Sequence, residues 1–483
     1  MSSAGRPRLR HALRALAPGR LTGPVLVLMG GTVAAQAVAY LARPVLTRLF
    51  TPEAFGAFGF YLAVVGTAAA AATGRYEAAI PLPASDRDGA GVWALALALG
   101  AAAAALALLV VPFRAPLAAA VGRPDLAGLL ALVPAGVLAA SWATATEAWL
   151  ARRDRFSTMS SARVAQSATG VPAQLAAGLA GAGAAGLVGG HLAGRAVGVA
   201  VLAWRSAGEL RGAWRGVAAL ARRYRRFPAF SMPSGVLNTL STQLPAFFLL
   251  RQGEALGLYV LAFGTLAVPL QLVGSSVGQV FFVRAAQAHR DGRLARLTGR
   301  VFSRLSAVGL FPIAAVALAG PAVFAVVFGE AWRGAGLYAA FLAPWLYFVF
   351  VSSPLSTLFD VLERQPWELG FNVASTVMRA VALAAGGWAA GATGAIAAFG
   401  AASAALWLGH AVWMLRWGGV PLGAAARTIG RHAAVAAVPL AVVAGAVTWG
   451  AGDVEVLATL VASAVLWVGL TAWAEPGVWR RPT

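Results

Sequence analysis

Long apolar segments alternate with short polar connections along most of the chain. An α-helix needs about 20 predominantly apolar residues to cross a bilayer, and a window of that length predicts about fourteen such helices. The predicted spans are residues 23–48, 54–74, 89–113, 127–150, 159–181, 184–204, 231–250, 255–282, 301–328, 335–360, 367–388, 391–415, 432–450 and 454–473. We therefore expect an all-α polytopic membrane protein.

The seventh and eighth predicted spans are joined by a short acidic connection and are preceded by a basic run at residues 222–226. Each span carries polar residues at helical spacing, among them Asn238 on the first and Gln271 and Gln279 on the second. Lipid would penalise a polar helix face. We therefore expect these faces to point towards protein or a water-filled cavity.

Composition supports the membrane class and excludes others. Hydrophobic residues make up 59% of the 483 residues and charged residues only 11%, so no water-soluble fold could bury so much apolar surface. The net charge of +21 comes from arginine, since the chain contains no lysine. These cations lie in short loops rather than on a soluble face, which argues against nucleic-acid binding. The absence of cysteine excludes disulfides and thiolate metal sites.

The distribution of arginine predicts the orientation. Residues 1–20 form a basic leader that we expect on the cytoplasmic side, and most later arginines fall in loops on the same side. The predicted outer loops contain only Arg114, Arg123, Arg251 and Arg333. Both termini are therefore predicted to be cytoplasmic. No loop reaches the length of about 50 residues that a separate catalytic domain needs, which favours transport over enzymatic activity.

An internal repeat predicts two lobes. Residues 53–58 open the second span and residues 254–259 open the eighth with a similar sequence, beginning Glu-Ala-Phe-Gly and Glu-Ala-Leu-Gly. Because an even number of spans separates the copies, the lobes should be parallel bundles of about six helices each. The expected parts are a leader (1–20), an N-terminal lobe (21–204), a basic linker (205–228), a C-terminal lobe (229–415) and a terminal helix pair with its tail (416–483). Such lobes suggest a transporter that rocks about a site between them.

Several motifs carry a family resemblance. They are residues 46–56, 75–83, 279–286, 328–332 and 342–365. As a set they resemble the bacterial polysaccharide-biosynthesis flippases of the Wzx type, within the multidrug/oligosaccharidyl-lipid/polysaccharide (MOP) exporter superfamily. The match extends from about Gly30 to Gln365, and beyond it only hydropathy supports the assignment.

The resemblance implies that the protein translocates an undecaprenyl-diphosphate-linked oligosaccharide across the bacterial inner membrane, for O-antigen, capsule or exopolysaccharide synthesis. It implies no cofactor. The implied partners are this lipid-linked substrate, membrane lipids, a glycan polymerase and a chain-length regulator. Arginine suits the pyrophosphate because its planar guanidinium donates several hydrogen bonds and stays charged.

Three candidate cations, Arg43, Arg48 and Arg75, lie on helices that line the cavity in the family. The alternative is that Arg48 and Arg75 reach the headgroups and that Arg75 pairs with Glu77. We expect Arg43, the deepest of the three, to be the most important cation.

Other candidates lie within the spans. Arg163 and Arg195 are in the fifth and sixth, Arg379 is in the eleventh, and Glu147 lies near the inner end of the fourth. An ionisable residue at such depth is functional or paired, and ion pairing between the lobes is the alternative role.

Polar and aromatic residues complete the set of candidates. Asn238, Gln243 and Gln271 are candidates for contacts with sugar hydroxyls, and hydrogen bonding between helices is their alternative role. We interpret Trp332 and Trp345 as interfacial anchors.

Two other function classes remain open. A cation-coupled drug antiporter of the same superfamily would need buried carboxylates, and the N-terminal lobe offers little beyond Glu77 and Glu147. A membrane-embedded glycan polymerase or ligase would need a large outer loop with catalytic groups, which the loop lengths do not provide.

Overall fold

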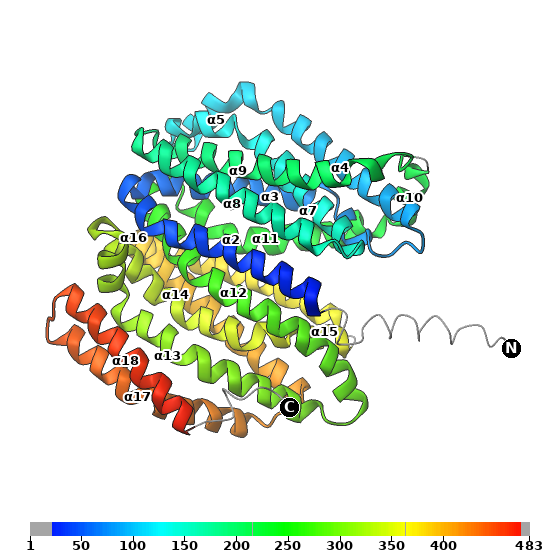
Figure 1. Cartoon of the computed structure of the whole chain (residues 1–483). Coiled ribbons are helices and arrows are strands. Elements are labelled where there is room, and N and C mark those ends of the chain that lie inside the picture. The colour runs from blue at the N-terminus through cyan, green and yellow to red at the C-terminus, as the bar shows by residue number, and fades with distance from the viewer. Residues whose placement is uncertain (1–21, 215, 363, 475–483) are drawn as a thin grey trace. The chain divides into compact units, whose positions relative to one another are not determined.

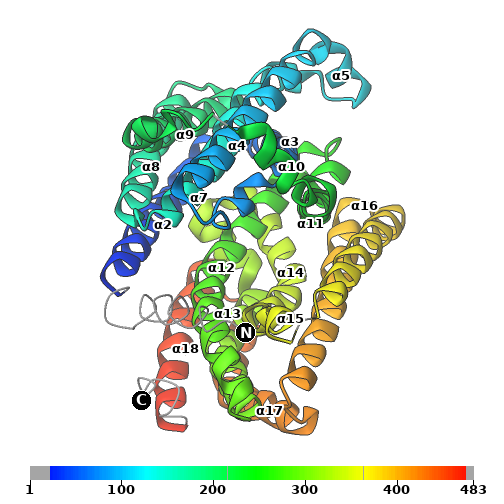
Figure 2. The ribbon, with the colours of Figure 1, turned by 90° about the vertical axis from the view of Figure 1, so that its right-hand side faces the viewer.

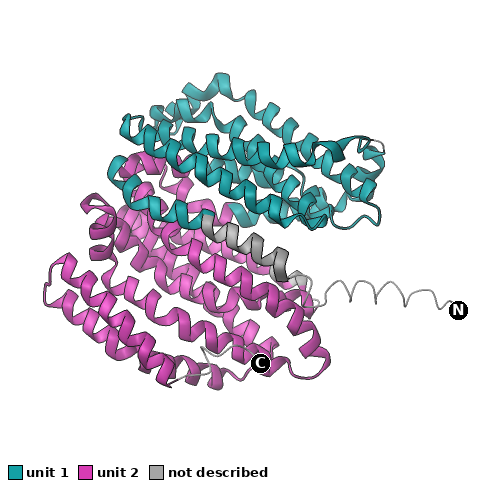
Figure 3. Ribbon diagram, in the orientation of Figure 1, with its two compact units in different colours: residues 1–49, 61–239 teal, residues 50–60, 240–483 magenta. Residues whose placement is uncertain are grey.

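The computed structural model describes residues 22–214, 216–362 and 364–474, and every element assigned there is helical. The predicted leader and the chain end from residue 475 lie outside these residues. The chain divides into two compact units (Figure 3), of which unit 1 comprises Met1–Leu49 and Tyr61–Thr239 and unit 2 comprises Phe50–Phe60 and Leu240–Thr483. The division into lobes predicted from the sequence remains a prediction.

Unit 1 is built from long helices that lie side by side (Figure 1). They are α2 (Thr22–Leu49), most of α3 (Pro52–Ala72), α4 (Asp86–Leu108), α7 (Val133–Arg152), α8 (Phe156–Leu179), α9 (Gly183–Ser206) and the start of α11 (Met232–Phe248). The shorter elements are η1 (Tyr76–Ala79), η2 (Val111–Phe113), α5 (Arg114–Ala120), η3 (Pro124–Leu126), α6 (Ala127–Leu130), η4 (Ala207–Leu210), α10 (Val217–Arg223) and η5 (Phe227–Ser231).

Local sequence explains how these helices begin and pack. Ser85 caps α4, because its side chain accepts a hydrogen bond from the backbone N–H of Asp88. Trp93 of α4 stacks on Trp149 of α7, with 5.5 Å between ring centroids, and both rings are buried. Gly194 allows α9 to approach α8 closely, since a Cβ there would lie 2.5 Å from the carbonyl oxygen of Gln166.

Unit 2 contains the first turns of α3, the rest of α11, and the helices that follow. These are α12 (Gly253–Arg290), α13 (Leu294–Phe328), η6 (Glu330–Trp332), α14 (Arg333–Ser352), η7 (Ser353–Thr357), α15 (Leu358–Val361), α16 (Gln365–Trp417), α17 (Leu422–Thr448) and α18 (Asp453–Ala474). The last two pack against α13 (Figures 1 and 2), where Phe311 stacks on Trp467 at 5.1 Å.

The described residues contain nine helices that are long and apolar enough to cross a membrane, or ten if the bent pair Pro124–Leu130 and Val133–Arg152 is one span. The count of about fourteen is therefore not confirmed. Three of the predicted spans correspond to α2, α8 and α11, which are helical but are not among these nine. Two more fall within α16, whose backbone leaves helical geometry at Ala390 and Gly391.

Candidate functional site

The membrane-spanning part of unit 1 contains a cluster of charged side chains from three helices. Arg163 of α8 forms a bidentate contact with Glu147 of α7, at 3.0 Å from Nη2 to Oε2 and 3.3 Å from Nε to Oε1. Arg195, near the middle of α9, lies close enough to interact electrostatically with both of them and with Tyr61 of α3. The cluster thus combines two guanidiniums with one carboxylate, and its net charge is positive.

The side chains of this cluster are partly accessible. Arg163 retains 33% and Glu147 retains 29% of their side-chain exposure. Arg163 and Glu147 form an ion pair between two helices of unit 1, whereas the predicted alternative was ion pairing between the lobes, which remains a prediction. His191 lies one turn from Arg195 on α9 and also interacts with it electrostatically.

Arg43 and Arg48 lie on the half of α2 that is predicted to be near the outer side of the membrane. The Arg43 guanidinium stacks over the ring of Tyr40 at 4.6 Å, in a cation–π contact one turn away on the same helix, and it is partly buried. Arg48 is exposed, and its Nη1 donates to the carbonyl oxygen of Pro44 at 2.7 Å. The substrate contacts predicted for both remain predictions.

Arg75 follows α3 and has a left-handed backbone, with φ of 61°. Its Nη1 lies 3.6 Å from Oε1 of Glu77, and the Thr73 hydroxyl donates a hydrogen bond to Oε2 of the same carboxylate. Its guanidinium also lies against α11, because a Cβ at Gly235 would be 3.3 Å from the Arg75 Nε. That buried Nε has no hydrogen-bond partner among the described groups. Strained residues of this kind are concentrated at functional sites.

The segment after Arg75 is fixed to the basic linker. The Tyr76 hydroxyl donates to the carbonyl oxygen of Ala221 at 3.0 Å. Burial raises the pKa of Tyr76, so its hydroxyl stays neutral and continues to donate. The buried neighbour Tyr76 therefore helps to set the position of Arg75.

The three polar residues predicted to contact sugars lie on α11 and α12. Asn238 and Gln271 are exposed, and Gln243 is partly buried on α11. Contacts of these residues with sugar hydroxyls remain predictions.

Unit 2 has a buried arginine of a different kind. Arg379 of α16 is only 4% exposed, and its Nε and Nη1 donate to the hydroxyls of Ser403 and Ser241 at 3.0 and 3.1 Å. The guanidinium lies over the rings of Trp345 and Phe399, at 5.0 and 5.6 Å from their centroids. Arg379 thereby joins α11, α14 and the two halves of α16.

Sequence reasoning missed the aromatic part of this environment. Trp345 was predicted to anchor an interface, but it is 4% exposed and packs against Phe263 and Phe399. Trp332 is also buried, in edge contact with Phe55 of α3. Hydropathy could not reveal either burial, because a tryptophan near the end of a span has the same pattern whether it faces lipid or protein.

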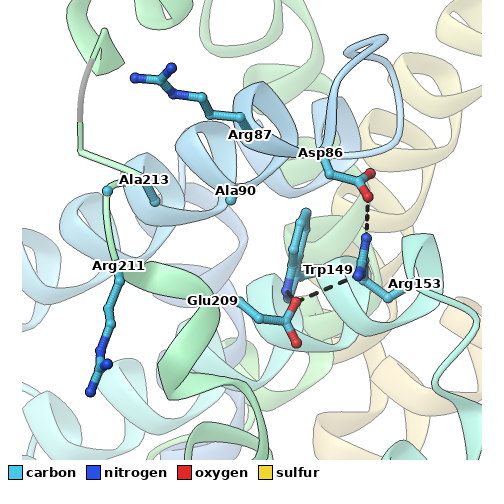
Figure 4. A pocket seen from close by; sticks show the side chains of 9 residues that line it. Asp86, Arg87, Ala90, Trp149, Arg153, Glu209, Arg211 and Ala213 are labelled. Atoms are coloured by element: carbon cyan, nitrogen blue, oxygen red, sulfur yellow. Dashed lines mark hydrogen bonds and ion pairs between the residues drawn. The ribbon is translucent and has the colours of Figure 1, made fainter.

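A cavity of about 390 Å³ lies at the predicted inner ends of α4 and α7, beside the turn at residues 211–213 (Figure 4). Arg153 lies between Asp86 and Glu209 and forms ion pairs with both. Glu209 also accepts from the indole N–H of Trp149 at 2.9 Å. Because these charges already pair with one another, we interpret the network as a brace between α4, α7 and η4.

The sequence was compared with protein families and with known proteins. The family model described as "Polysaccharide biosynthesis protein" matches residues 45–336. None of the curated proteins matches the sequence at a significant level.

Several solved structures share the fold. A structure of the lipid II flippase MurJ in an inward closed conformation has a TM-score of 0.72 at 9% identity, and the alignment covers 94% of this chain and 100% of that one. An inward-facing multidrug resistance MATE family transporter of the MOP superfamily has a TM-score of 0.57 at 14% identity, covering 80% and 95%. A MOP superfamily transporter from Pyrococcus furiosus has a TM-score of 0.56 at 14% identity, covering 82% and 94%.

The family match covers more than half of the chain, and the structural matches establish the fold. The chain therefore belongs to the polysaccharide biosynthesis protein family and is a multi-span membrane protein whose fold is shared with the MurJ and MATE structures.

Proposed function

We propose that the protein flips an undecaprenyl-diphosphate-linked oligosaccharide from the cytoplasmic to the outer leaflet of the bacterial inner membrane. The observation that carries this proposal is the net-positive cluster of Arg163, Arg195 and Glu147 within the membrane-spanning part of unit 1. A charge at this depth is costly and marks the path of a polar or charged substrate. The family match and the MurJ-like fold support the same class of substrate.

The chemistry of the cluster fits a pyrophosphate. Glu147 offsets one guanidinium and orients Arg163 through two hydrogen bonds. The second guanidinium, on Arg195, can then donate to phosphate oxygens as a planar fork. The glycan would remain in water and the polyprenyl tail in lipid, so the protein has to stabilise mainly the anionic centre.

The architecture that we propose for this cycle has about fourteen spans, with α16 counted as two helices that meet at Ala390 and Gly391. The helices α2, α8 and α11, which the sequence also predicts as spans, are counted among the fourteen. We propose that the predicted lobes exchange access by rocking and that both termini are cytoplasmic. A chain without lysine cannot carry a phosphate-binding loop that ends in Lys-Ser or Lys-Thr, which excludes ATP hydrolysis through such a loop. In our proposal the free energy for transport comes from an ion gradient, from the membrane potential or from consumption of the product.

The test is flipping by the purified full chain in liposomes that contain undecaprenyl-diphosphate-linked oligosaccharide with a fluorescent glycan. A membrane-impermeant quencher reports which leaflet the glycan occupies. We expect Arg195→Gln to slow flipping by roughly 10- to 150-fold, because a charge-assisted hydrogen bond contributes about 1.5–3 kcal/mol. Arg195→Lys should be intermediate, since it keeps the charge and loses the fork.

A matched control lies on the same helix. Arg205 of α9 is exposed and stacks on Trp204, so Arg205→Gln removes one charge from α9 outside the cluster. The proposal fails if Arg195→Gln and Arg205→Gln flip at equal rates. Uptake of a fluorescent cationic drug by liposomes that do not flip the glycan would instead favour the antiporter.

A further inference from the structure

Arg379 is a buried charge for which the proposed transport cycle has no use. An arginine side chain cannot lose its proton in a protein. No carboxylate among the described residues lies within ion-pair distance of Arg379, and its two hydrogen-bonded partners are neutral serine hydroxyls. A cation within a membrane-spanning helix normally has a charged partner or lines an aqueous path.

Three further polar groups near Arg379 are buried and have no hydrogen-bond partner among the described groups. They are the Tyr259 hydroxyl, the Trp345 indole N–H and the Ser375 hydroxyl. Trp345 underlies the guanidinium, and Tyr259 interacts with it electrostatically and contacts Phe399. Ser375 precedes Arg379 by one helical turn and so lies on the same face.

These groups can all donate hydrogen bonds, and the indole N–H and the guanidinium can do nothing else. Buried donors are normally satisfied, and each one left unpaired is costly. A cation would be repelled by Arg379 and would find no carboxylate there. The set of groups is therefore matched to an acceptor with a negative charge.

We propose that unit 2 binds a chloride-sized monovalent anion at Arg379, with the Tyr259 hydroxyl and the Trp345 indole N–H as further donors. The single uncompensated positive charge fits one negative charge. The rings of Phe263 and Phe399 pack against Tyr259 and Trp345, and such apolar surroundings favour a small, weakly hydrated ion over a phosphate group. The anion joins α12, α14 and α16 within unit 2, and its binding does not depend on which lipid the protein transports.

The test is thermal unfolding of the purified full chain in detergent, with chloride replaced stepwise by gluconate at constant ionic strength. A ligand that binds only the folded state stabilises it in proportion to the logarithm of one plus its concentration over Kd. We expect the unfolding temperature to change little while chloride or bromide is well below Kd and to rise with the logarithm of its concentration above Kd. Tyr259→Phe and Trp345→Phe should each raise the apparent Kd about fivefold, which corresponds to one neutral hydrogen bond of about 1 kcal/mol.

The matched control is Tyr347→Phe. Tyr347 is another tyrosine of unit 2, and its hydroxyl lies 2.8 Å from that of Ser306. This variant should unfold at a lower temperature and keep the wild-type dependence on chloride. If Arg379→Gln folds, its unfolding temperature should no longer depend on chloride. If it does not fold, Tyr259→Phe and Trp345→Phe test the site.

Two results would overturn the anion site. The first is a wild-type unfolding temperature that is the same in chloride and gluconate. The second is that Tyr259→Phe and Trp345→Phe unfold at higher temperatures than the wild type by the same amount in chloride and in gluconate. The two donors would then be unpaired in the folded protein and would bind no anion.

Discussion

A glycine contact between α3 and α12 leads to a prediction that can be worked out from the structure. A Cβ at Gly257 would lie 1.7 Å from the carbonyl oxygen of Pro52. Ordinary contact begins at 3.4 Å, so Gly257→Ala requires a local separation of about 1.7 Å, the difference between these two distances. The obstructing atom belongs to the backbone, and no side-chain rotation can relieve the overlap.

The same contact occurs a second time with the partners exchanged. A Cβ at Gly56 would lie 2.1 Å from the carbonyl oxygen of Gly253. Gly56 and Gly257 are equivalent positions of the internal repeat, and so are Pro52 and Gly253. The two helices therefore cross about a local two-fold axis. One outward movement of the helices would relieve both overlaps.

We expect Gly257→Ala and Gly56→Ala each to lower the free energy of unfolding by about 1–3 kcal/mol, the usual range for overpacking. The double variant should lose clearly less than the sum, because the two changes share one relaxation. Gly274→Ala is the control on α12, since nothing lies within 4 Å of its Cβ. It should gain up to about 1 kcal/mol from helix propensity.

The measurement is reversible unfolding in mixed micelles as the fraction of denaturing detergent rises. The shared contact would be refuted if the double variant lost as much free energy of unfolding as Gly56→Ala and Gly257→Ala lose together. Single variants as stable as Gly274→Ala would refute the close approach itself.

Three further predictions concern the predicted site and orientation. Arg75→Gly should stabilise the protein by roughly 1 kcal/mol, because it relieves a left-handed backbone, and it should slow flipping. The control is Asp154→Gly, which relieves a similar φ of 53°. It should gain the same stability without changing the flipping rate. Equal flipping by both variants would remove Arg75 from the path. Arg43→Ala should insert normally but fail to complement a flippase deletion, with Arg43→Lys in between, and full activity of the alanine variant would contradict its predicted role. A cysteine at Gln252 should react with an impermeant reagent from outside the cell, and labelling from the cytoplasm alone would reverse the predicted orientation.

The helical fold could be predicted from the sequence because hydropathy reports the length and polarity of each segment directly. The sequence predicts two spans within the residues of α16, for instance. The backbone departs from helical geometry at Ala390 and Gly391, where the two predicted spans meet. Hydropathy does not report which way a helix face is turned. For that reason Arg379 could be identified as an ionisable residue within a span, whereas its contact with Ser241, 138 positions away, could not be foreseen.

Accessibility separates the roles of the two arginine environments. A substrate that binds and leaves in every cycle must exchange with water, and the Arg163–Glu147 pair remains about one-third exposed. Arg379 is 4% exposed and is held by two serines and two aromatic rings, which suits a resident ion that stays bound. Substitution of Arg195 should therefore change flipping more than stability. Substitution of Arg379 should change stability and its dependence on chloride more than the apparent affinity for the glycolipid.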